Sequence, residues 1–281
     1  MNKKLKLVDS FLFWNEIDLL KTRLEYLGPL VDYFLISEAN IDFAGKPKKF
    51  ILDRELIQSL PYSEKIIYQK CDVDLLSIKW LLKKLRYITR KSRFLWRLQD
   101  FQRNSLLTAA RDLDSQDIII FGDLDEFPRI SEIRSLTNPT PSSSSLPIAL
   151  EQEFFYYTIH NKSTDLNSWH GTIISTVEYF RKVKPNHLRS LRERLKSLPN
   201  AGWHFSYFMS SEKIREKILA TADVEKKEVF KALSSEEILL KIKSGSDLYS
   251  DQLAFSYNES NHKNIDPDLL MALKKYMPHC T

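Results

Sequence analysis

The stretch that decides the fold of this chain is Asp117-Ile118-Ile119-Ile120-Phe121-Gly122-Asp123-Leu124-Asp125-Glu126-Phe127-Pro128-Arg129. Its four consecutive apolar residues, 118–121, include three that are β-branched. Such a run is typical of a strand buried on both faces, as in a parallel sheet, and it is too short for a helix. Gly122 ends the run. The sequence therefore predicts a buried strand of an α/β sheet over residues 118–121.

Three carboxylates follow this strand within four positions, at Asp123, Asp125 and Glu126. In an open α/β sheet, ligands bind at the carboxyl ends of the strands. Clustered carboxylates repel one another unless a cation lies between them, and their hard oxygen atoms suit Mg²⁺ or Mn²⁺. The Asp-x-Asp pair therefore indicates a divalent ion held against a diphosphate. A solvated turn that is merely acidic is the alternative, because a bare Asp-x-Asp is common.

The first third of the chain has the pattern of a parallel sheet. Residues 5–8 and 11–14 predict a short strand and its exit, and residues 17–27 have helical spacing that Gly28-Pro29 stops. A second buried strand is expected at residues 31–37 and a third at 65–68. This β-α-β opening predicts an α/β fold with a mixed, mostly parallel sheet flanked by helices.

The second half is expected to be a separate lobe of the same domain. Residues 138–147 would form a flexible linker rich in Pro and Ser between a first half, 1–137, and a second half, 148–258. Within that half we expect strands at 148–159 and 169–177, and helices at 211–220 and 234–243. Residues 259–281 are expected to be a loosely held C-terminal tail.

Composition sets the broad class. The chain has 281 residues, 43% hydrophobic and 28% charged, which is ordinary for a globular enzyme. Its net charge of +5 suits anionic ligands without requiring nucleic acid. Two cysteines, Cys71 and Cys280, are too few for a disulfide framework, so a reducing compartment is expected. With no signal-peptide pattern and no long apolar run, we expect a cytoplasmic location.

Two basic stripes stand out. From Lys79 to Gln99 there are eight basic residues and no acidic one, and Arg181–Lys196 holds seven Lys or Arg against one Glu. A helix with its cations in water explains such a stripe, and so does a surface that meets anionic lipid or phosphate. Peripheral contact with a membrane is therefore a hypothesis for these stripes.

Five blocks of sequence carry a family resemblance. They are, in order, Asp9-Ser10-Phe11-Leu12-Phe13-Trp14-Asn15-Glu16-Ile17-Asp18-Leu19-Leu20; Val31-Asp32-Tyr33-Phe34-Leu35-Ile36-Ser37-Glu38-Ala39-Asn40 with Phe43-Ala44-Gly45-Lys46-Pro47-Lys48; Gln102-Arg103-Asn104; Asp117–Arg129; and Gly202-Trp203-His204-Phe205-Ser206. Together they resemble glycosyltransferase family 17, whose best-known member adds the bisecting N-acetylglucosamine to N-glycans. The last block lacks the cysteines of animal members, so the donor chemistry transfers better than the acceptor.

The resemblance implies a GT-A-like fold, with residues 1–137 as the nucleotide-binding half and 148–258 as the acceptor half, and a metal site. Asp123 and Asp125 would hold Mn²⁺ or Mg²⁺ on the donor diphosphate, and His204 would complete the site. Glu126 would support this pair, or it is a carboxylate near a helix N-terminus. Cations at the start of the following helix would clamp the diphosphate or remain solvated; these are Lys213, Arg215 and Lys217.

Residues near the ends of other elements would contact the nucleotide. Glu38 and Asn40 end the second predicted strand, and Gly45 and Lys46 lie in the next loop, where a simple turn is the alternative. Arg103, with Arg97, precedes the acidic loop on a predicted helix, where phosphate binding and an ion pair with Asp100 are both plausible.

An inverting reaction of this family needs one base for the acceptor hydroxyl proton. Glu153 stands out because a charged residue within an apolar strand is costly unless it is used or paired. Asp247 and Asp251 are the alternatives, and the sequence does not separate the three.

The sequence thus predicts an inverting, metal-dependent glycosyltransferase that moves a sugar from a UDP-sugar, with UDP-N-acetylglucosamine favoured. The acceptor would be a glycan hydroxyl, such as that of a mannose, or a lipid-linked glycan. A metal-dependent phosphoesterase or nuclease is a second reading of the carboxylates and basic stripes. A non-catalytic module that docks on polysaccharide or membrane is a third.

Overall fold

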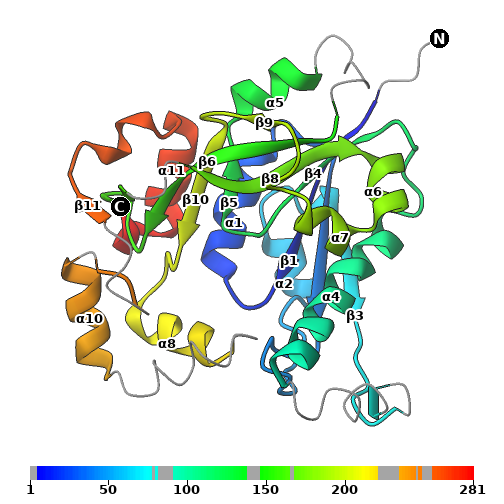
Figure 1. Ribbon diagram of the computed structural model, residues 1–281, viewed down its shortest axis with the longest axis horizontal. Helices are drawn as coiled ribbons and strands as arrows, with labels where there is room; N and C mark the ends of the chain where they lie inside the picture. Colours follow the sequence, from blue (N-terminus) through cyan, green and yellow to red (C-terminus); the bar gives the residue numbers. More distant parts are fainter. Residues whose placement is uncertain are drawn as a thin grey trace.

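The parallel half of the sheet is seen in the computed structural model, which describes residues 5–77, 80–81, 91–137, 146–164, 168–220, 234–244, 246–248 and 255–281. Its strands are β1 (Leu7–Phe13), β2 (Tyr33–Ala39), β3 (Ile66–Cys71) and β4 (Ile118–Phe121), in the spatial order β3-β2-β1-β4. All neighbouring pairs among them are parallel. Helix α1 (Ile17–Leu27) connects β1 to β2 (Figure 1), so the predicted β-α-β opening is confirmed.

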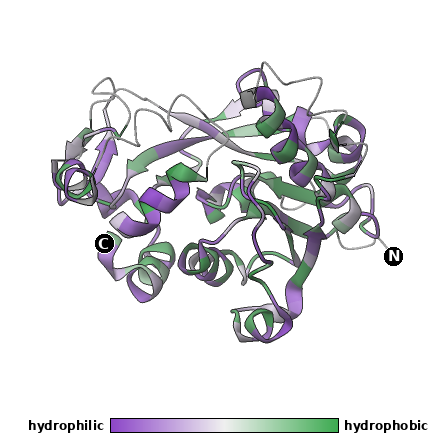
Figure 2. Ribbon diagram, turned by 90° about the horizontal axis from the view of Figure 1, so that it is seen from below, coloured by the Kyte–Doolittle hydropathy of each residue, from purple (hydrophilic) through white to green (hydrophobic). Residues whose placement is uncertain are grey.

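Side chains of β1 alternate between two cores, one on each face of the sheet, as the two-residue period of a strand requires. Phe11 and Phe13 belong to the core covered by α1 and α11 (Pro267–Tyr276). Val8 and Leu12 belong to the core covered by α4 (Lys91–Ala109), α6 (Val177–Val183) and α7 (Pro185–Ser190). Figure 2 shows hydrophobic residues gathered along the central strands. The result is a sheet flanked by helices on both faces.

Antiparallel strands extend the sheet beyond β4. β8 (Trp169–Thr176) pairs with β4, and the long strand β6 (Ile148–Tyr156) pairs with β8. β10 (Gly202–Ser206) runs parallel to β6 and antiparallel to β5 (Glu126–Pro128). The remaining strands are β7 (Asn161–Ser163), β9 (Ser197–Leu198) and β11 (Phe255–Tyr257). The fold is therefore the α/β architecture expected from the sequence, a mixed sheet flanked by helices.

Short elements complete the molecule. After β10 come α8 (Ser211–Leu219) and α10 (Ser235–Ser244), close to the helices expected there. The others are α2 (Arg54–Ser59), α5 (Ile130–Thr137), η1 (Ser63–Lys65), η3 (Asn261–Asn264) and η4 (Pro278–Cys280). None of the described helices is both long and apolar enough to cross a membrane.

The segment that ends the chain differs from the loosely held tail that we expected. Helix α11 packs on α1, and Ile265, Leu269, Leu273 and Cys280 are buried in the same core as Phe11. Tyr26 on α1 donates a hydrogen bond of 2.7 Å to Asp266. The spacing of these apolar residues is the signal that the tail interpretation overlooked. Residues 138–145 of the expected linker and 82–90 of the first basic stripe lie outside the described residues.

Candidate active site

The Asp-x-Asp loop is held in place by its backbone. It lies between the carboxyl end of β4 and the short strand β5, and the amide of Phe205 on β10 donates to the carbonyl of Asp125 at 2.8 Å. The buried Arg23 of α1 donates to the carbonyls of Asp123, Leu124 and Glu126 at 3.4, 3.4 and 2.5 Å. A bidentate pair with the buried Asp9, at 2.7 Å for each contact, fixes this guanidinium. One buried ion pair therefore sets the path of the loop.

Asp125 lies between a histidine and a lysine. Its Oδ1 is 3.5 Å from Nε2 of His204 on β10, and its Oδ2 is 3.4 Å from Nζ of Lys217 on α8. Lys217 Nζ is also 3.2 Å from Glu16, which precedes α1. Burial alone would raise the pKa of Asp125, but the charges of Lys217 and His204 outweigh it and hold the pKa below its ordinary value of 3.8. This carboxylate is therefore charged at neutral pH.

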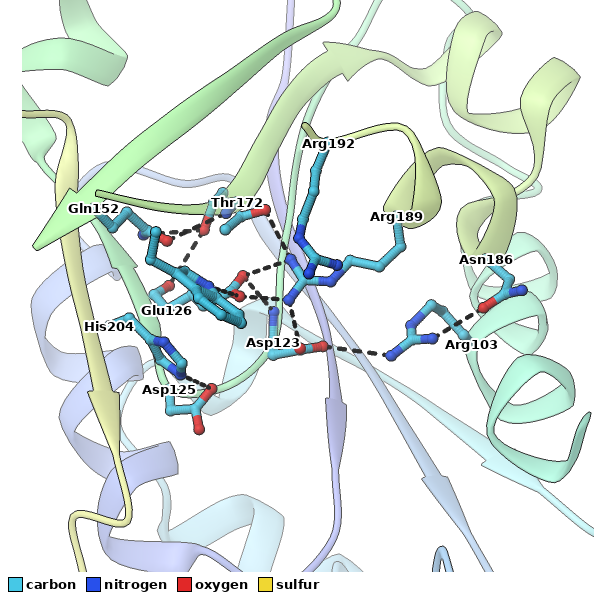
Figure 3. Close-up of polar contacts among 12 residues, drawn as sticks. Arg103, Asp123, Asp125, Glu126, Gln152, Thr172, Asn186, Arg189, Arg192 and His204 are labelled. Carbon is cyan, nitrogen blue, oxygen red and sulfur yellow. Dashed lines mark hydrogen bonds and ion pairs between the residues drawn. The ribbon is translucent and has the colours of Figure 1, made fainter. Parts of the chain in front are cut away.

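Asp123 points in a different direction, toward arginines. Its Oδ2 accepts a hydrogen bond of 2.7 Å from Arg189, which lies on α7, and its Oδ1 is 3.6 Å from Arg103 on α4. Figure 3 shows Asp125 beside His204 while Asp123 turns to the two guanidinium groups. The Asp123 side chain is 39% exposed, against 15% for Asp125. The two aspartates therefore do not share one partner.

Glu126 is the anchor behind Asp123. Its side chain is fully buried, and its two oxygens accept hydrogen bonds from Arg189 at 2.5 and 3.0 Å. It also accepts from Nε1 of Trp169 at 2.9 Å and from the amide of Asp123 at 3.0 Å. Gly122 leaves room for this carboxylate, because a Cβ there would lie 2.8 Å from Glu126 Oε2. Glu126 belongs to strand β5 and not to a helix N-terminus, so it supports the loop.

Sequence reasoning missed Arg189 as a site residue. It is buried, and burial would lower its pKa, but Asp123 and Glu126 outweigh that effect and raise it. The signal was present in the basic stripe Arg181–Lys196, which was interpreted as surface. Arg181 of that stripe is likewise used internally, since it donates to three carbonyls that follow α4. Part of this stripe therefore serves the fold and the site.

A cleft of about 200 Å³ opens beside the two aspartates. One part of its wall is apolar and aromatic, formed by Leu12 near the end of β1, by Trp14 just after that strand, and by Phe43. The rest of the wall is polar or charged and consists of Glu16, Gln99, Asp123, Asp125, Tyr207 and Lys217, with Leu124. An apolar flat surface next to charged groups is the arrangement that a nucleoside diphosphate needs.

Glu38 and Asn40 are engaged by the chain itself. Glu38 is fully buried and accepts hydrogen bonds from Lys48, from Tyr68 and from the amides of residues 51 and 52. Asn40 bonds to Asp72 and to the amide of Val73. Both side chains hold loops against the sheet, which corrects their assignment to the nucleotide. The sequence places a carboxylate at the end of a buried strand and so predicts that it needs hydrogen-bond partners, but it does not say which residues those partners are.

Gly45 and Lys46 form a turn. The amides of both residues donate to Asp42, and Gly45 has a φ of +75°, a conformation that favours glycine. Lys46 is exposed and does not line the cleft, whereas Phe43 of the same loop does. The loop therefore reaches the candidate site through a residue that we did not single out.

The predicted cations divide between the site and the surface. Arg103 is buried, donates to Asn186 at 2.9 Å and lies near Asp123. Arg97 pairs with Asp100 at 3.4 Å on the surface of α4. Lys213 pairs with Asp18 at 3.1 Å. Lys217, one turn further along α8, is the lysine that reaches the Asp-x-Asp loop.

The three candidate bases have different positions. Phe154 on β6 packs on the ring of His204 at 4.7 Å, so its neighbour Glu153 points to the opposite face of the strand. There Glu153 pairs with Lys162 at 2.5 Å, which removes it from the cleft and corrects that expectation. Asp247 is buried and accepts a hydrogen bond of 3.2 Å from Tyr156, which shares the face of Phe154. Asp251 lies outside the described residues.

The donor set fits a divalent ion only in part. Asp125 and His204 converge and offer the oxygen and nitrogen atoms that Mn²⁺ accepts. Within the described ranges, no group of three or more His, Cys, Asp or Glu side chains is arranged to hold a metal. A hard divalent ion commonly takes one or two protein ligands and fills its other positions with phosphate and water. Two converging ligands are compatible with that mode, whereas the carboxylate of Asp123 faces Arg189 and Arg103 in this structure.

Comparison with known proteins adds the family. The family model described as Glycosyltransferase family 17 matches residues 1–266. No curated protein matches the chain. Similar solved structures include a 4-diphosphocytidyl-2C-methyl-D-erythritol synthase, with 10% identity, a TM-score of 0.41, and coverage of 78% of this chain and 99% of that chain. Another is the galactosyltransferase LgtC in complex with donor and acceptor sugar analogs, with 11% identity, a TM-score of 0.33, and coverage of 66% and 64%.

Proposed function

This chain belongs to glycosyltransferase family 17, and we propose that it is an inverting, metal-dependent member that transfers N-acetylglucosamine from UDP-N-acetylglucosamine to a glycan hydroxyl. Membership of the family makes the chain a glycosyltransferase with a nucleotide-sugar donor and a glycan acceptor. The identity of the sugar, the need for metal and the β-linkage are the proposal.

One observation supports the proposal most strongly. Asp125, His204 and Lys217 meet at the charged end of a cleft whose other wall is apolar and aromatic. A nucleoside would lie on Trp14 and Phe43, and its diphosphate would then reach the charged end. Preorganised charges at this end would stabilise the negative charge that develops on the departing UDP.

Asp125 and His204 would hold Mn²⁺ or Mg²⁺, with the remaining positions left to phosphate oxygens and water. When bound, the ion would neutralise charge on the leaving diphosphate. Asp123 has a different task in this arrangement. Its exposed face lines the cleft while Arg189 and Arg103 fix its orientation, so it would accept a hydrogen bond from the donor.

We assign the acceptor proton to Asp247, with Asp251 as the alternative. The acceptor oxygen forms a bond to the anomeric carbon as the bond from that carbon to the β-phosphate oxygen breaks, and the carboxylate takes the hydroxyl proton. Asp247 lies on the His204 side of β6 through its contact with Tyr156. A mannose or a lipid-linked glycan is the acceptor class we favour, and peripheral membrane contact through the basic stripes would serve the latter.

Calorimetry of donor binding tests the proposal. We expect UDP-N-acetylglucosamine to bind more tightly with Mn²⁺ than without it, and GDP-mannose to bind weakly in either case. In Asp125→Asn the Mn²⁺ dependence should disappear, whereas Asp18→Asn, which removes an exposed carboxylate paired with Lys213, should retain it. Equal Mn²⁺ dependence in Asp125→Asn and the parent protein would contradict the metal assignment.

A further inference from the structure

Lys217 occupies a position between two carboxylates of the cleft. Its Nζ is 3.2 Å from Glu16 Oε1 and 3.4 Å from Asp125 Oδ2. These partners come from separate parts of the chain, one preceding α1 and one following β4, while the lysine comes from α8. Two carboxylates from distant segments therefore converge on a single cation position, and a side chain of the protein fills it.

Helix α8 fixes the backbone position of Lys217 but not the position of its ammonium group. Ile214 and Ile218 are buried and hold the helix, whereas Lys217 itself remains 25% exposed. Its Nζ also lies 5.7 Å from the centre of the Tyr207 ring, which lines the same cleft. Because a lysine side chain has several rotatable bonds, the ammonium can move along the cleft without moving the helix.

Lys217 keeps its charge in this position. A lysine is protonated at neutral pH, and the carboxylates of Glu16 and Asp125, at 3.2 and 3.4 Å, favour that charge. A divalent ion on Asp125 would therefore meet a full positive charge only a few ångströms away. Two cations at such a separation repel each other strongly where water is partly excluded.

We infer that Lys217 is a resident counter-ion that holds the cation position at Asp125 in the metal-free protein and yields it to the divalent ion when the donor binds. The displaced ammonium then contacts the donor diphosphate, whose charge it matches. This inference rests on the proposed metal-dependent function. It predicts opposite effects of removing Lys217 on two ligands, which a purely structural role would not produce.

The chain supplies a matched control on the same helix. Lys213 lies one turn before Lys217, has the same charge and forms one ion pair of 3.1 Å, with Asp18. It is 48% exposed and does not line the cleft beside the Asp-x-Asp pair. Lys213→Met therefore removes an equal charge from α8 without opening the position at Asp125.

The experiment measures Mn²⁺ and UDP separately. Mn²⁺ binding without nucleotide is followed by electron paramagnetic resonance of the free ion, and UDP binding at saturating Mn²⁺ by calorimetry. We expect Lys217→Met to bind Mn²⁺ roughly tenfold more tightly and UDP roughly fivefold more weakly than the parent protein. Lys213→Met should leave both affinities within about twofold. Lys217→Arg, which keeps the charge, should retain the weak Mn²⁺ binding of the parent.

The inference is overturned if Lys217→Met binds Mn²⁺ no more tightly than the parent, or if UDP affinity is unchanged. Lys217→Gln repeats the measurement should the methionine variant melt at a lower temperature. If neither parent nor variants bind Mn²⁺ while UDP-N-acetylglucosamine still binds, the inference and the metal role both fall but the transferase assignment stands. Failure of the parent to bind any UDP-sugar would instead refute the proposed donor.

Discussion

Asp123 and Asp125 are separated by one residue, yet their surroundings differ in kind. Asp123 faces Arg189 and Arg103, and Arg189 in turn grips the buried Glu126. Asp125 faces His204 and Lys217. Guanidinium groups are planar, permanently charged and suited to fixed bidentate pairs, whereas imidazole and ammonium groups titrate or move. The arginine side is therefore suited to stay in place, and the inference about Lys217 requires the histidine–lysine side to exchange partners.

Removing Arg189 should test the fixed side with the largest effect. Arg189→Met leaves the fully buried Glu126 without its cation, which we expect to cost about 3–5 kcal/mol of unfolding free energy. Unfolding by guanidinium chloride at pH 7 measures this loss of unfolding free energy. Arg192→Met is the control, because Arg192 pairs with the exposed Glu193 at 3.6 Å and should contribute about 0–1 kcal/mol. A stable Arg189→Met would show that Glu126 finds another partner and that the arginine side is not fixed.

Asp125→Asn tests the histidine–lysine side. It removes the carboxylate that faces both His204 and Lys217, so we expect kcat to fall roughly 10²–10³-fold. Transfer from UDP-N-acetylglucosamine, read by release of UDP, is the measurement. Full turnover in this variant would remove Asp125 from the reaction.

Asp123→Asn should have a smaller effect on the rate. Arg189 keeps its contacts with Glu126 in this variant, so the loop retains its position and only the carboxylate facing the cleft is lost. We expect a loss of roughly tenfold in kcat/KM, seen by the same assay. A loss larger than that of Asp125→Asn would reverse the ranking of the two aspartates.

The pH dependence of stability is expected to give the smallest effect. The pKa of Asp125 is lower in the folded chain than its ordinary 3.8, so the unfolded chain binds the proton first as pH falls. The contribution of Asp125 is thus complete above about pH 5 and declines as the pH drops through 3.8 toward the folded value. The melting temperature of Asp125→Asn should therefore fall less than that of the parent between pH 7 and pH 3.5. Parallel melting curves would mean that Lys217 and His204 do not stabilise this charge.

Local patterns predicted the elements well because they depend on neighbours in sequence. The apolar run 118–121, the helical spacing of 17–27 and the strands on either side follow from periodicity that the chain carries locally. The acidic loop was also placed correctly at the carboxyl edge of the sheet. What each carboxylate contacts was not predictable in this way, since Arg23, Arg189 and Lys217 approach the loop from distant segments.

The Gln102-Arg103-Asn104 block illustrates the same limit. Gln102 donates to carbonyls of β1 and β2 at 3.3 and 3.0 Å, and Asn104 accepts from the amide of Asn186 at 3.1 Å. Two of its three residues therefore hold α4 against the sheet and α7, and only Arg103 reaches the site. A family motif marks residues that matter without saying whether they act on substrate or on the backbone.

The contact between α1 and α11 has a consequence for how the protein is made. Tyr26 and Asp266 are 240 positions apart, yet they join in one hydrogen bond within a shared core. Contacts of such long range form slowly, because a large loop must close before they bring any gain. During synthesis the apolar face of α1 that packs on α11 therefore stays uncovered until residues 267–276 have been translated, which leaves apolar surface exposed on the incomplete chain.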